Sequence, residues 1–220
     1  MQTIFQTIQS SISINKYQFS VGLIFAMHLF GAIIIRGNLI ENFILLTPVN
    51  LIVSLILLLW THGEISKKFI FICLISFTTG FTFEFIGTKT GLIFGDYAYG
   101  ETLGFQIGDV PLIIGVNWLI LVYSSAAIVN YFLEKSHVVL KSIISATLMV
   151  GLDFFIEPVA MKYDFWSWAN DIIPIQNYIA WFIIAFFLLV ITHHSIIIKN
   201  KIAIALFIAQ SLFFIILNFV

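Results

Sequence analysis

Three acidic side chains stand inside long apolar segments, where a charge is costly and therefore marks a candidate functional site. They are Glu84, Asp153 and Glu157. Asp153 and Glu157 are four residues apart, so a helix would place both carboxyls on one face. Two carboxyls held that close in an apolar setting are not expected to ionise together. At least one would stay protonated at neutral pH, which is the state that a general acid needs.

The surroundings of these acids leave alternatives open. Pro158 follows the pair directly and frees the carbonyl of Phe154, which is tolerated at membrane depth only where protein or water encloses it. Glu84 lies near the end of its own apolar segment at a comparable depth, so the three acids could converge. In a second interpretation, Asp153 and Glu157 contact water or Lys162 at the end of their helix, and the side chain of Glu84 extends to the lipid headgroups.

Aromatic residues gather in the two connections next to the acids, at about 87–110 and 161–176. Interfacial belts collect Trp and Tyr, but electron-rich rings also stabilise a cation through their negative faces. Glycines in the first connection would let it turn tightly or pack as a re-entrant lid. Asn117 and Asn177 could hold a water or a carboxyl, or only bridge two helices. The candidate substrate- or cation-binding residues are Tyr97, Tyr99, Trp118, Trp166, Trp168, Asn177 and Trp181.

Membrane helices must position these residues. Of the 220 residues, 60% are hydrophobic and only 10% are charged, with a mean hydropathy of +1.07, whereas soluble proteins carry charge on about a quarter of their residues. A span needs about 20 apolar residues, and seven such segments occur, at about 18–35, 43–61, 69–86, 111–133, 141–160, 177–197 and 202–219. The prediction is an all-α polytopic bundle of about seven spans that forms one domain over 1–220. Residues 1–15 could form an interfacial helix, and residues 80–185 form the motif-bearing core.

Several function classes are disfavoured by what the chain lacks. No basic stripe is present to bind nucleic acid. The five histidines do not form the repeated clusters of membrane di-iron enzymes, and Cys73 is the single cysteine. The chain also has no aspartate-rich diphosphate motif, no dinucleotide fingerprint and no Lys in its last apolar segment for a retinal Schiff base. The sequence therefore predicts an activity without a metal or cofactor.

The order and spacing of the motifs resemble the carotenoid-synthesis family of membrane proteins, which includes carotenoid end-group hydratases. The resemblance covers roughly residues 80–185. The chain departs from the family's pattern at Glu157, where many relatives are expected to have Asp, so the division of roles between Asp153 and Glu157 stays open. The motifs are Glu84-x-x-Gly87-x-x-x-Gly91-x-x-Phe94-Gly95-x-Tyr97-x-Tyr99, Pro111 with Trp118, Asp153-x-x-x-Glu157-Pro158, Trp166-x-Trp168 and Asn177-x-x-x-Trp181.

The resemblance implies addition of water across the terminal carbon–carbon double bond of an acyclic carotenoid, which gives a tertiary alcohol. Asp153, Glu157 and Glu84 would be catalytic, the aromatic rings would face the cation and Asn177 would hold the water. A carotenoid cyclase begins with the same protonation, so it remains an alternative, as do a proton-coupled transporter of a lipophilic solute and a structural subunit. The expected setting is multi-pass in the cell membrane. The expected partners are a carotenoid substrate, membrane lipids and other enzymes of the pathway, without nucleic acid.

The distribution of cations predicts the orientation of the chain. With the N-terminus in the cytoplasm, seven lysines face that side and only Arg36, Lys89 and Lys162 face the exterior, as the positive-inside rule favours. A reporter fused after Lys67 should therefore report the cytoplasm, and one fused after Val220 the exterior. If both fusions report the same compartment, the predicted number of spans is wrong by one.

Overall fold

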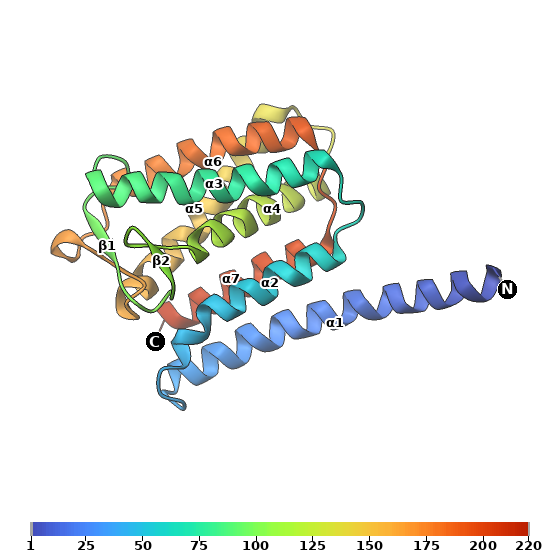
Figure 1. Ribbon diagram of the computed structural model, residues 1–220, viewed down its shortest axis with the longest axis horizontal. Helices are drawn as coiled ribbons and strands as arrows, with labels where there is room; N and C mark the ends of the chain where they lie inside the picture. Colours follow the sequence, from blue (N-terminus) through green and yellow to red (C-terminus); the bar gives the residue numbers. More distant parts are fainter. Residues whose placement is uncertain (1, 220) are drawn as a thin grey trace.

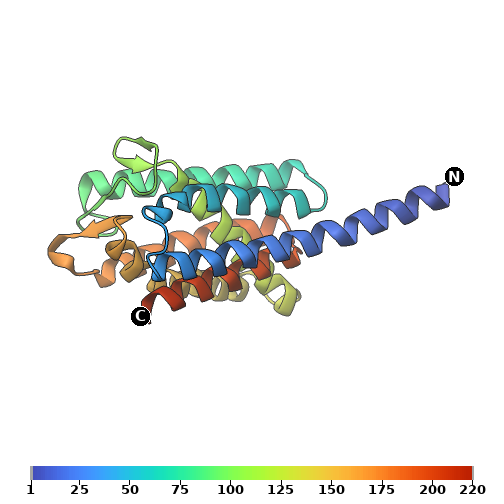
Figure 2. The ribbon, with the colours of Figure 1, turned by 90° about the horizontal axis from the view of Figure 1, so that it is seen from below.

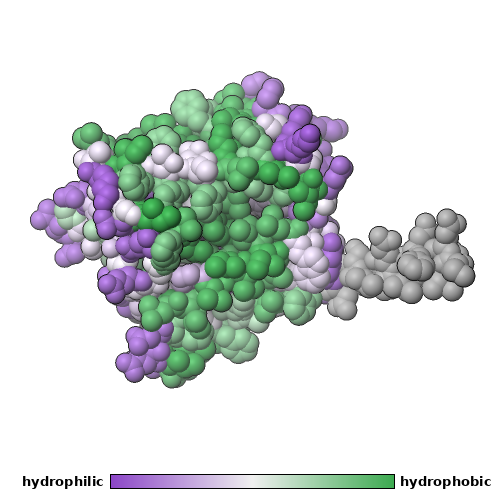
Figure 3. Space-filling view, viewed as in Figure 1, coloured by the Kyte–Doolittle hydropathy of each residue, from purple (hydrophilic) through white to green (hydrophobic). Residues whose placement is uncertain are grey.

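The computed structural model describes the backbone of residues 2–219 and the side chains of residues 16–219. Seven helices in this part of the chain are long and apolar enough to cross a membrane, which confirms the seven-span bundle. The space-filling view has a broad hydrophobic belt between two hydrophilic ends (Figure 3). The helices are α1 (Gln2–Arg36), α2 (Thr47–Thr61) after a 3₁₀ turn (Phe43–Leu46), α3 (Lys67–Thr90), α4 (Ile113–Leu133), α5 (Val138–Lys162), α6 (Ile175–Ser195) and α7 (Lys201–Asn218).

Helix α4 is the centre of the bundle. Within an 18-residue stretch of α4, 83% of the residues are buried, against no more than 44% in the corresponding stretch of any other span. The buried side of α4 includes the small residues Gly115, Ser124, Ser125, Ala126 and Ala127. Small residues let neighbouring helix backbones approach closely in a membrane, where packing replaces the hydrophobic effect between helices. Helices α3, α5, α6, α7 and α2 all contact α4, and α1 packs outside against α7 and α2 (Figures 1 and 2).

Local signals in the sequence set the helix ends. Ser66 begins α3 by accepting a hydrogen bond from the backbone N–H of Phe69, and Asn200 begins α7 in the same way, as capping residues commonly do. Gly91 ends α3 in the left-handed conformation with φ of 66°, which glycine adopts without a steric cost. Asn200 also donates to Thr61 and Tyr123. It thereby ties α7 to α2 and α4 at the end of the bundle opposite the strands.

The two long connections form short strands at one end of the bundle (Figure 1). Strand β1 (Tyr97–Tyr99) pairs antiparallel with β4 (Trp166–Trp168), and β2 (Gln106–Ile107) pairs with β3 (Val110–Pro111). We call these four strands the cap. The sequence analysis left open whether the first connection turns tightly or packs as a re-entrant lid, and it named no strands. The strands lie across the helix ends, where β1 of the first connection finds its backbone hydrogen-bonding partners in β4 of the second.

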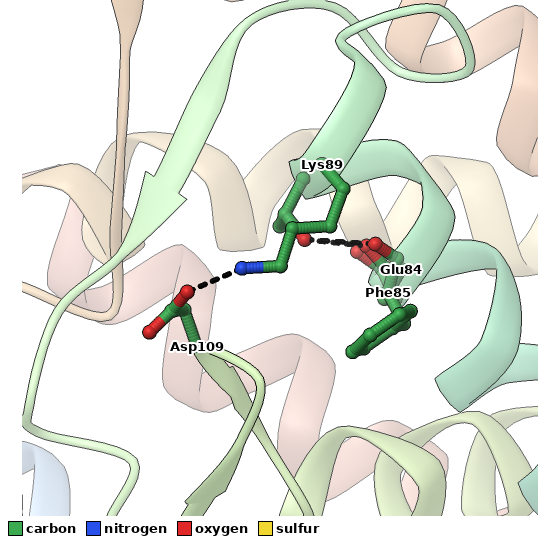
Figure 4. A network of polar contacts seen from close by, with 5 residues as sticks. Glu84, Phe85, Lys89 and Asp109 are labelled. Atoms are coloured by element: carbon green, nitrogen blue, oxygen red, sulfur yellow. Dashed lines mark hydrogen bonds and ion pairs between the residues drawn. The ribbon is translucent and has the colours of Figure 1, made fainter.

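The β2–β3 hairpin contacts α3 at its tip. Gly108 and Asp109 both have positive φ, of 59° and 65°, as in the tight two-residue turn that suits a hairpin. This turn presents Asp109 to Lys89 in the last turn of α3, where the two side chains form an ion pair (Figure 4). Both are substantially exposed, so the pair contributes little to stability and mainly sets where the hairpin lies.

The interfacial helix predicted for residues 1–15 falls on residues whose side chains lie outside the described part of the chain, so it stays a prediction. Tyr17, near the start of the α1 span, donates to the carbonyl of Thr61 at the end of α2. Asn218, at the end of α7, donates to the carbonyl of Phe155 near the cap. The two ends of the spanning region therefore lie at opposite ends of the bundle, as an odd number of spans requires. Which end faces the cytoplasm remains the prediction made above.

Candidate active site

Pairing of β1 with β4 places four aromatic rings together. Tyr97 lies opposite Trp168, and Tyr99 lies opposite Trp166. Side chains two residues apart in a strand point to the same face, so both pairs face the helices, while Ala98 and Ser167 face outward and are exposed. The Tyr97 and Trp168 ring centroids are 4.9 Å apart, and those of Tyr99 and Trp166 are 5.9 Å apart. The two sequence motifs Tyr-x-Tyr and Trp-x-Trp thus form one aromatic surface.

Glu84 of α3 lies beneath this surface and is 3% exposed. Its Oε2 atom accepts hydrogen bonds from the hydroxyls of Tyr97, at 2.6 Å, and Tyr99, at 2.8 Å. Its Oε1 atom accepts from the indole N–H of Trp118, at 3.2 Å. A carboxylate is a pure acceptor that can take several donors, so this environment favours the ionised form of Glu84. The alternative in which Glu84 extends to the headgroups is wrong.

Burial, followed by the negative charge of Glu84, raises the pKa values of Tyr97 and Tyr99. Both phenols therefore keep their protons at neutral pH and remain hydrogen-bond donors. This is the state that the carboxylate of Glu84 requires of them, since a phenolate could only accept.

Glu157 of α5 has an equally complete set of donors. The indole N–H groups of Trp166 and Trp168 donate to its Oε2 atom at 2.9 and 2.7 Å, and the Asn177 amide donates to its Oε1 atom at 2.8 Å. An indole nitrogen can only donate, so the two tryptophans must face an acceptor. With 1% of its surface exposed, Glu157 meets neither bulk water nor Lys162, and that alternative is wrong.

Asp153 differs from the other two acids in its hydrogen bonding. It is 1% exposed, and within the described part of the chain it accepts a single hydrogen bond, from the Asn177 amide to Oδ2 at 3.2 Å. The amide nitrogen of Asn177 thus bridges Asp153 and Glu157, which share a face of α5 as their spacing predicts. Of the three buried carboxyls, Asp153 therefore receives the least hydrogen-bond stabilisation of a negative charge.

A small cavity joins the three acids. Its volume is about 20 Å³, enough for roughly one water molecule. Asn117 of α4 is half-buried and lines it, and its side chain makes no hydrogen bond to another described residue. The lining residues are Glu84, Tyr97, Tyr99, Ile114, Asn117, Asp153, Ile156, Glu157, Trp166, Trp168, Asn177 and Trp181.

Trp118 and Trp181 form the inner wall of this cluster. Their rings stack with centroids 4.1 Å apart, and Trp118 is fully buried. Gly80 of α3 makes this possible, because a Cβ atom at that position would overlap the Trp118 indole. Gly87 is equally restricted, since a Cβ there would lie 2.6 Å from the Phe94 ring and 3.1 Å from the Tyr97 hydroxyl.

The structure brings together all ten residues that the sequence analysis proposed for the site. Two features were not foreseen. One is strand pairing, for which the alternation of aromatic residues in Tyr-x-Tyr and Trp-x-Trp was the available signal. The other is the contrast between the two amides. Asn177, expected to hold water, has its nitrogen directed to two carboxyls, whereas Asn117 faces the cavity.

Comparison with known proteins identifies the family of the chain. The family model described as carotenoid biosynthesis protein matches residues 41–220. The chain belongs to the carotenoid biosynthesis protein family. The match extends beyond the predicted motif region and takes in α2 and α7. Family membership gives the chain a role in carotenoid biosynthesis.

A curated relative carries a more specific name. The chain is 30% identical over 106 residues to bisanhydrobacterioruberin hydratase of Haloarcula japonica. The aligned part is 44% of this chain and 36% of that relative, so the chain spans about a third of the length of the relative that it matches. No solved structure gives a significant match.

Gly80→Ala tests the close approach of α3 and α4. The added methyl should displace Trp118, disturb its bond to Glu84 and destabilise the protein by about 1–3 kcal/mol, as overpacking of a core does. The measurement is the thermal unfolding midpoint of the purified protein in detergent, combined with tryptophan fluorescence.

Gly151→Ala in α5 is the matched control, because a Cβ atom there meets nothing within 4 Å. Alanine favours a helix interior over glycine by up to about 1 kcal/mol, so this variant should unfold at the same or a higher temperature. Equal behaviour of the two variants would contradict the packing described for Gly80.

Proposed function

We propose that this protein adds water to the terminal carbon–carbon double bond of an acyclic carotenoid and yields a tertiary alcohol. The observation that carries the proposal is the unequal hydrogen bonding of three buried carboxyls around a cavity for one water. Two of the acids are surrounded by donors and suit negative charge, while Asp153 has one donor. This arrangement supplies a proton donor and two fixed negative charges in one enclosed place, which is what hydration through a cation requires.

Asp153 is the proposed proton donor. Protonation of an isolated alkene needs an acid that is shielded from water. Asp153 is buried, and a single hydrogen bond gives its ionised form little stabilisation. Transfer of its proton to the less substituted alkene carbon forms a C–H bond and leaves a tertiary cation on the neighbouring carbon. Asn177, which donates to both carboxyls, holds Asp153 beside Glu157 and fixes its orientation.

Glu157, Glu84 and the aromatic rings would stabilise the cation. The two carboxylates are held by donors in the resting enzyme, so their charges need no reorganisation when the cation forms. The rings of the Tyr97–Trp168 and Tyr99–Trp166 pairs add their negative faces. Since Trp166 and Trp168 also orient Glu157, a phenylalanine at either position would keep a π face but lose an N–H donor.

Asn117 is the proposed water-holding residue. Its amide lines the cavity and can both donate to a water and accept from it. Attack of this water on the cation forms the C–O bond, and the proton that the added water loses returns to the carboxylate of Asp153. The sum is one alkene and one water converted into one alcohol, and the acid is restored without a redox step.

Substrate entry must change the site, because a cavity of about 20 Å³ has no room for a chain end. The cap supplies four of the donors to the acids, so its movement would open the site and weaken their hydrogen bonds together. We propose that the end of the substrate enters beneath β1 and β4, while the polyene lies among the Phe- and Ile-rich helices.

The experiment that tests the function is expression in a bacterium that accumulates lycopene, followed by mass analysis of the extracted pigment. The proposal expects a product heavier by one water. A product of unchanged mass with a new chromatographic position would indicate cyclisation. Unaltered pigment, despite protein present in the membrane, would contradict an action on lycopene.

Replacement of the acids by amides tests the division of roles. Asp153→Asn removes the transferable proton and keeps the shape of the side chain. Turnover should therefore fall by about 10²- to 10⁴-fold, which is the rate enhancement that general acid catalysis usually provides. Glu157→Gln and Glu84→Gln remove a charge from the cation site and should also lower turnover. The measurement is pigment conversion at matched amounts of membrane protein.

Glu101, which is exposed in the connection between β1 and β2, provides the control, since Glu101→Gln should convert pigment normally. A double variant Asp153→Asn with Glu157→Gln should be little worse than Asp153→Asn alone, because acids that act as one unit are not additive. Normal conversion by Asp153→Asn, with loss only in Glu84→Gln, would place the proton donor on α3 instead.

Independence from metals and cofactors is part of the proposal. Membranes washed with a chelator such as EDTA should retain their hydration activity, because the proposed steps use only carboxyls, rings and water. Activity that is lost on washing and restored by added iron alone would contradict it. The control is a buffer wash of the same membranes without chelator.

A further inference from the structure

A second, larger cavity lies between α1, α2 and α7, apart from the acids. Its volume is about 360 Å³, and most of its wall is apolar, with Phe30, Ile35, Phe43 and Phe213 among the lining residues. We call it the α1–α7 groove. Among the described residues, no Asp, Glu, Lys or Arg side chain lines it, so it offers no fixed counter-charge for a phosphate, carboxylate or ammonium group.

Gln210 of α7 lines this groove and is only 4% exposed. Its Oε1 atom has no hydrogen-bond partner among the described residues. A buried amide oxygen without a donor is costly, most of all at membrane depth, where bulk water does not reach. The oxygen has almost no surface open to the groove, and a half-turn of the amide about its last bond would exchange it for the nitrogen, so the amide can offer the groove an acceptor or a donor.

His28 of α1 supplies a second polar group to the same wall and is 6% exposed. Its Nδ1 atom lies 2.8 Å from the carbonyl oxygen of Ile24. A carbonyl can only accept, so Nδ1 carries the proton and donates, which leaves Nε2 as an acceptor. The ring packs edge-on against Phe213, with the centroids 5.9 Å apart, so its orientation is fixed from two sides.

We propose that the α1–α7 groove is a binding site for a neutral lipid alcohol. The apolar chain lies along the aromatic and aliphatic wall, and the hydroxyl donates to His28 Nε2. The amide nitrogen of Gln210 donates to the hydroxyl oxygen, so one alcohol group pairs with both polar side chains. A hydrocarbon would leave the amide unpaired, and a charged lipid headgroup would enter without a counter-charge.

The hydrocarbon part of the bound alcohol would identify where the alcohol comes from. An isoprenoid alcohol belongs to the same chemical class as the product of the proposed hydration, and a straight-chain alcohol would come from ordinary lipids. The inference does not require the proposed reaction, because the groove and the acids share no lining residue and the test below measures binding alone.

The test is equilibrium binding of tritiated geranylgeraniol to the purified protein in detergent, with unlabelled competitors. Phytane, a saturated isoprenoid hydrocarbon of the same carbon number, should compete about tenfold less well than geranylgeraniol, the effect of one hydrogen bond to a buried group. Competition by 1-eicosanol as strong as that by geranylgeraniol supports recognition of the hydroxyl on any chain. Weak competition by 1-eicosanol supports an isoprenoid alcohol.

Two variants make the result specific to the polar wall. Gln210→Met keeps the length of the side chain and removes the amide, so the preference for geranylgeraniol over phytane should fall severalfold, because the hydroxyl loses one of its two partners. This variant also removes an unpaired buried acceptor, so it should unfold at the same or a higher temperature than the wild type. Ser211→Ala is the control, because the Ser211 hydroxyl bonds only the Phe207 carbonyl of its own helix.

Two results would overturn the inference. The first is equal competition by phytane and geranylgeraniol in the wild type, which would mean that acyl chains merely fill the groove. The second is an undiminished preference for the alcohol in Gln210→Met. Neither result depends on pigment conversion, so failure of this inference is distinguishable from failure of the proposed hydratase.

Discussion

The structure depends on one constraint, which is that three carboxyl groups lie inside an apolar bundle where bulk water cannot solvate them. A buried charge is tolerated only when donors of the protein replace its hydration shell. Glu84 and Glu157 each receive three such donors. Those donors come from α4, α6, β1 and β4, so satisfying the acids fixes how helices far apart in the sequence meet.

The same constraint explains why the cap exists. Four of the six bonds to Glu84 and Glu157 come from aromatic residues of β1 and β4. Strand pairing aligns those side chains in register, and irregular loops would have to order each one separately. The donors are distributed unequally among the three acids, and Asp153 accepts one hydrogen bond. The unequal hydrogen bonding on which the proposed proton donor and two anions rest thus results from where the available N–H and O–H groups lie.

The sequence predicted the spans and the members of the site, since hydropathy and the rarity of acids at membrane depth are local signals. It did not predict which partner each acid takes. Glu157 meets Trp166 and Trp168 only because β1 and β4 pair, and the pairing of two short strands 70 residues apart depends on the helices beneath them. The close approach of α3 and α4 likewise rests on Gly80, which stands opposite Trp118 in space but not in sequence. The groove beside His28 and Gln210 combines three helices and has no motif of its own.

The most direct test of the central claim is infrared difference spectroscopy of the carboxylic C=O stretch, measured on the purified protein at neutral pH in H₂O and D₂O. The account predicts that the wild type has a band from a protonated carboxyl in an apolar site. This band should disappear in Asp153→Asn and persist in Glu157→Gln and Glu84→Gln. A band that persists in Asp153→Asn and disappears in Glu157→Gln would contradict the assignment of the proton to Asp153.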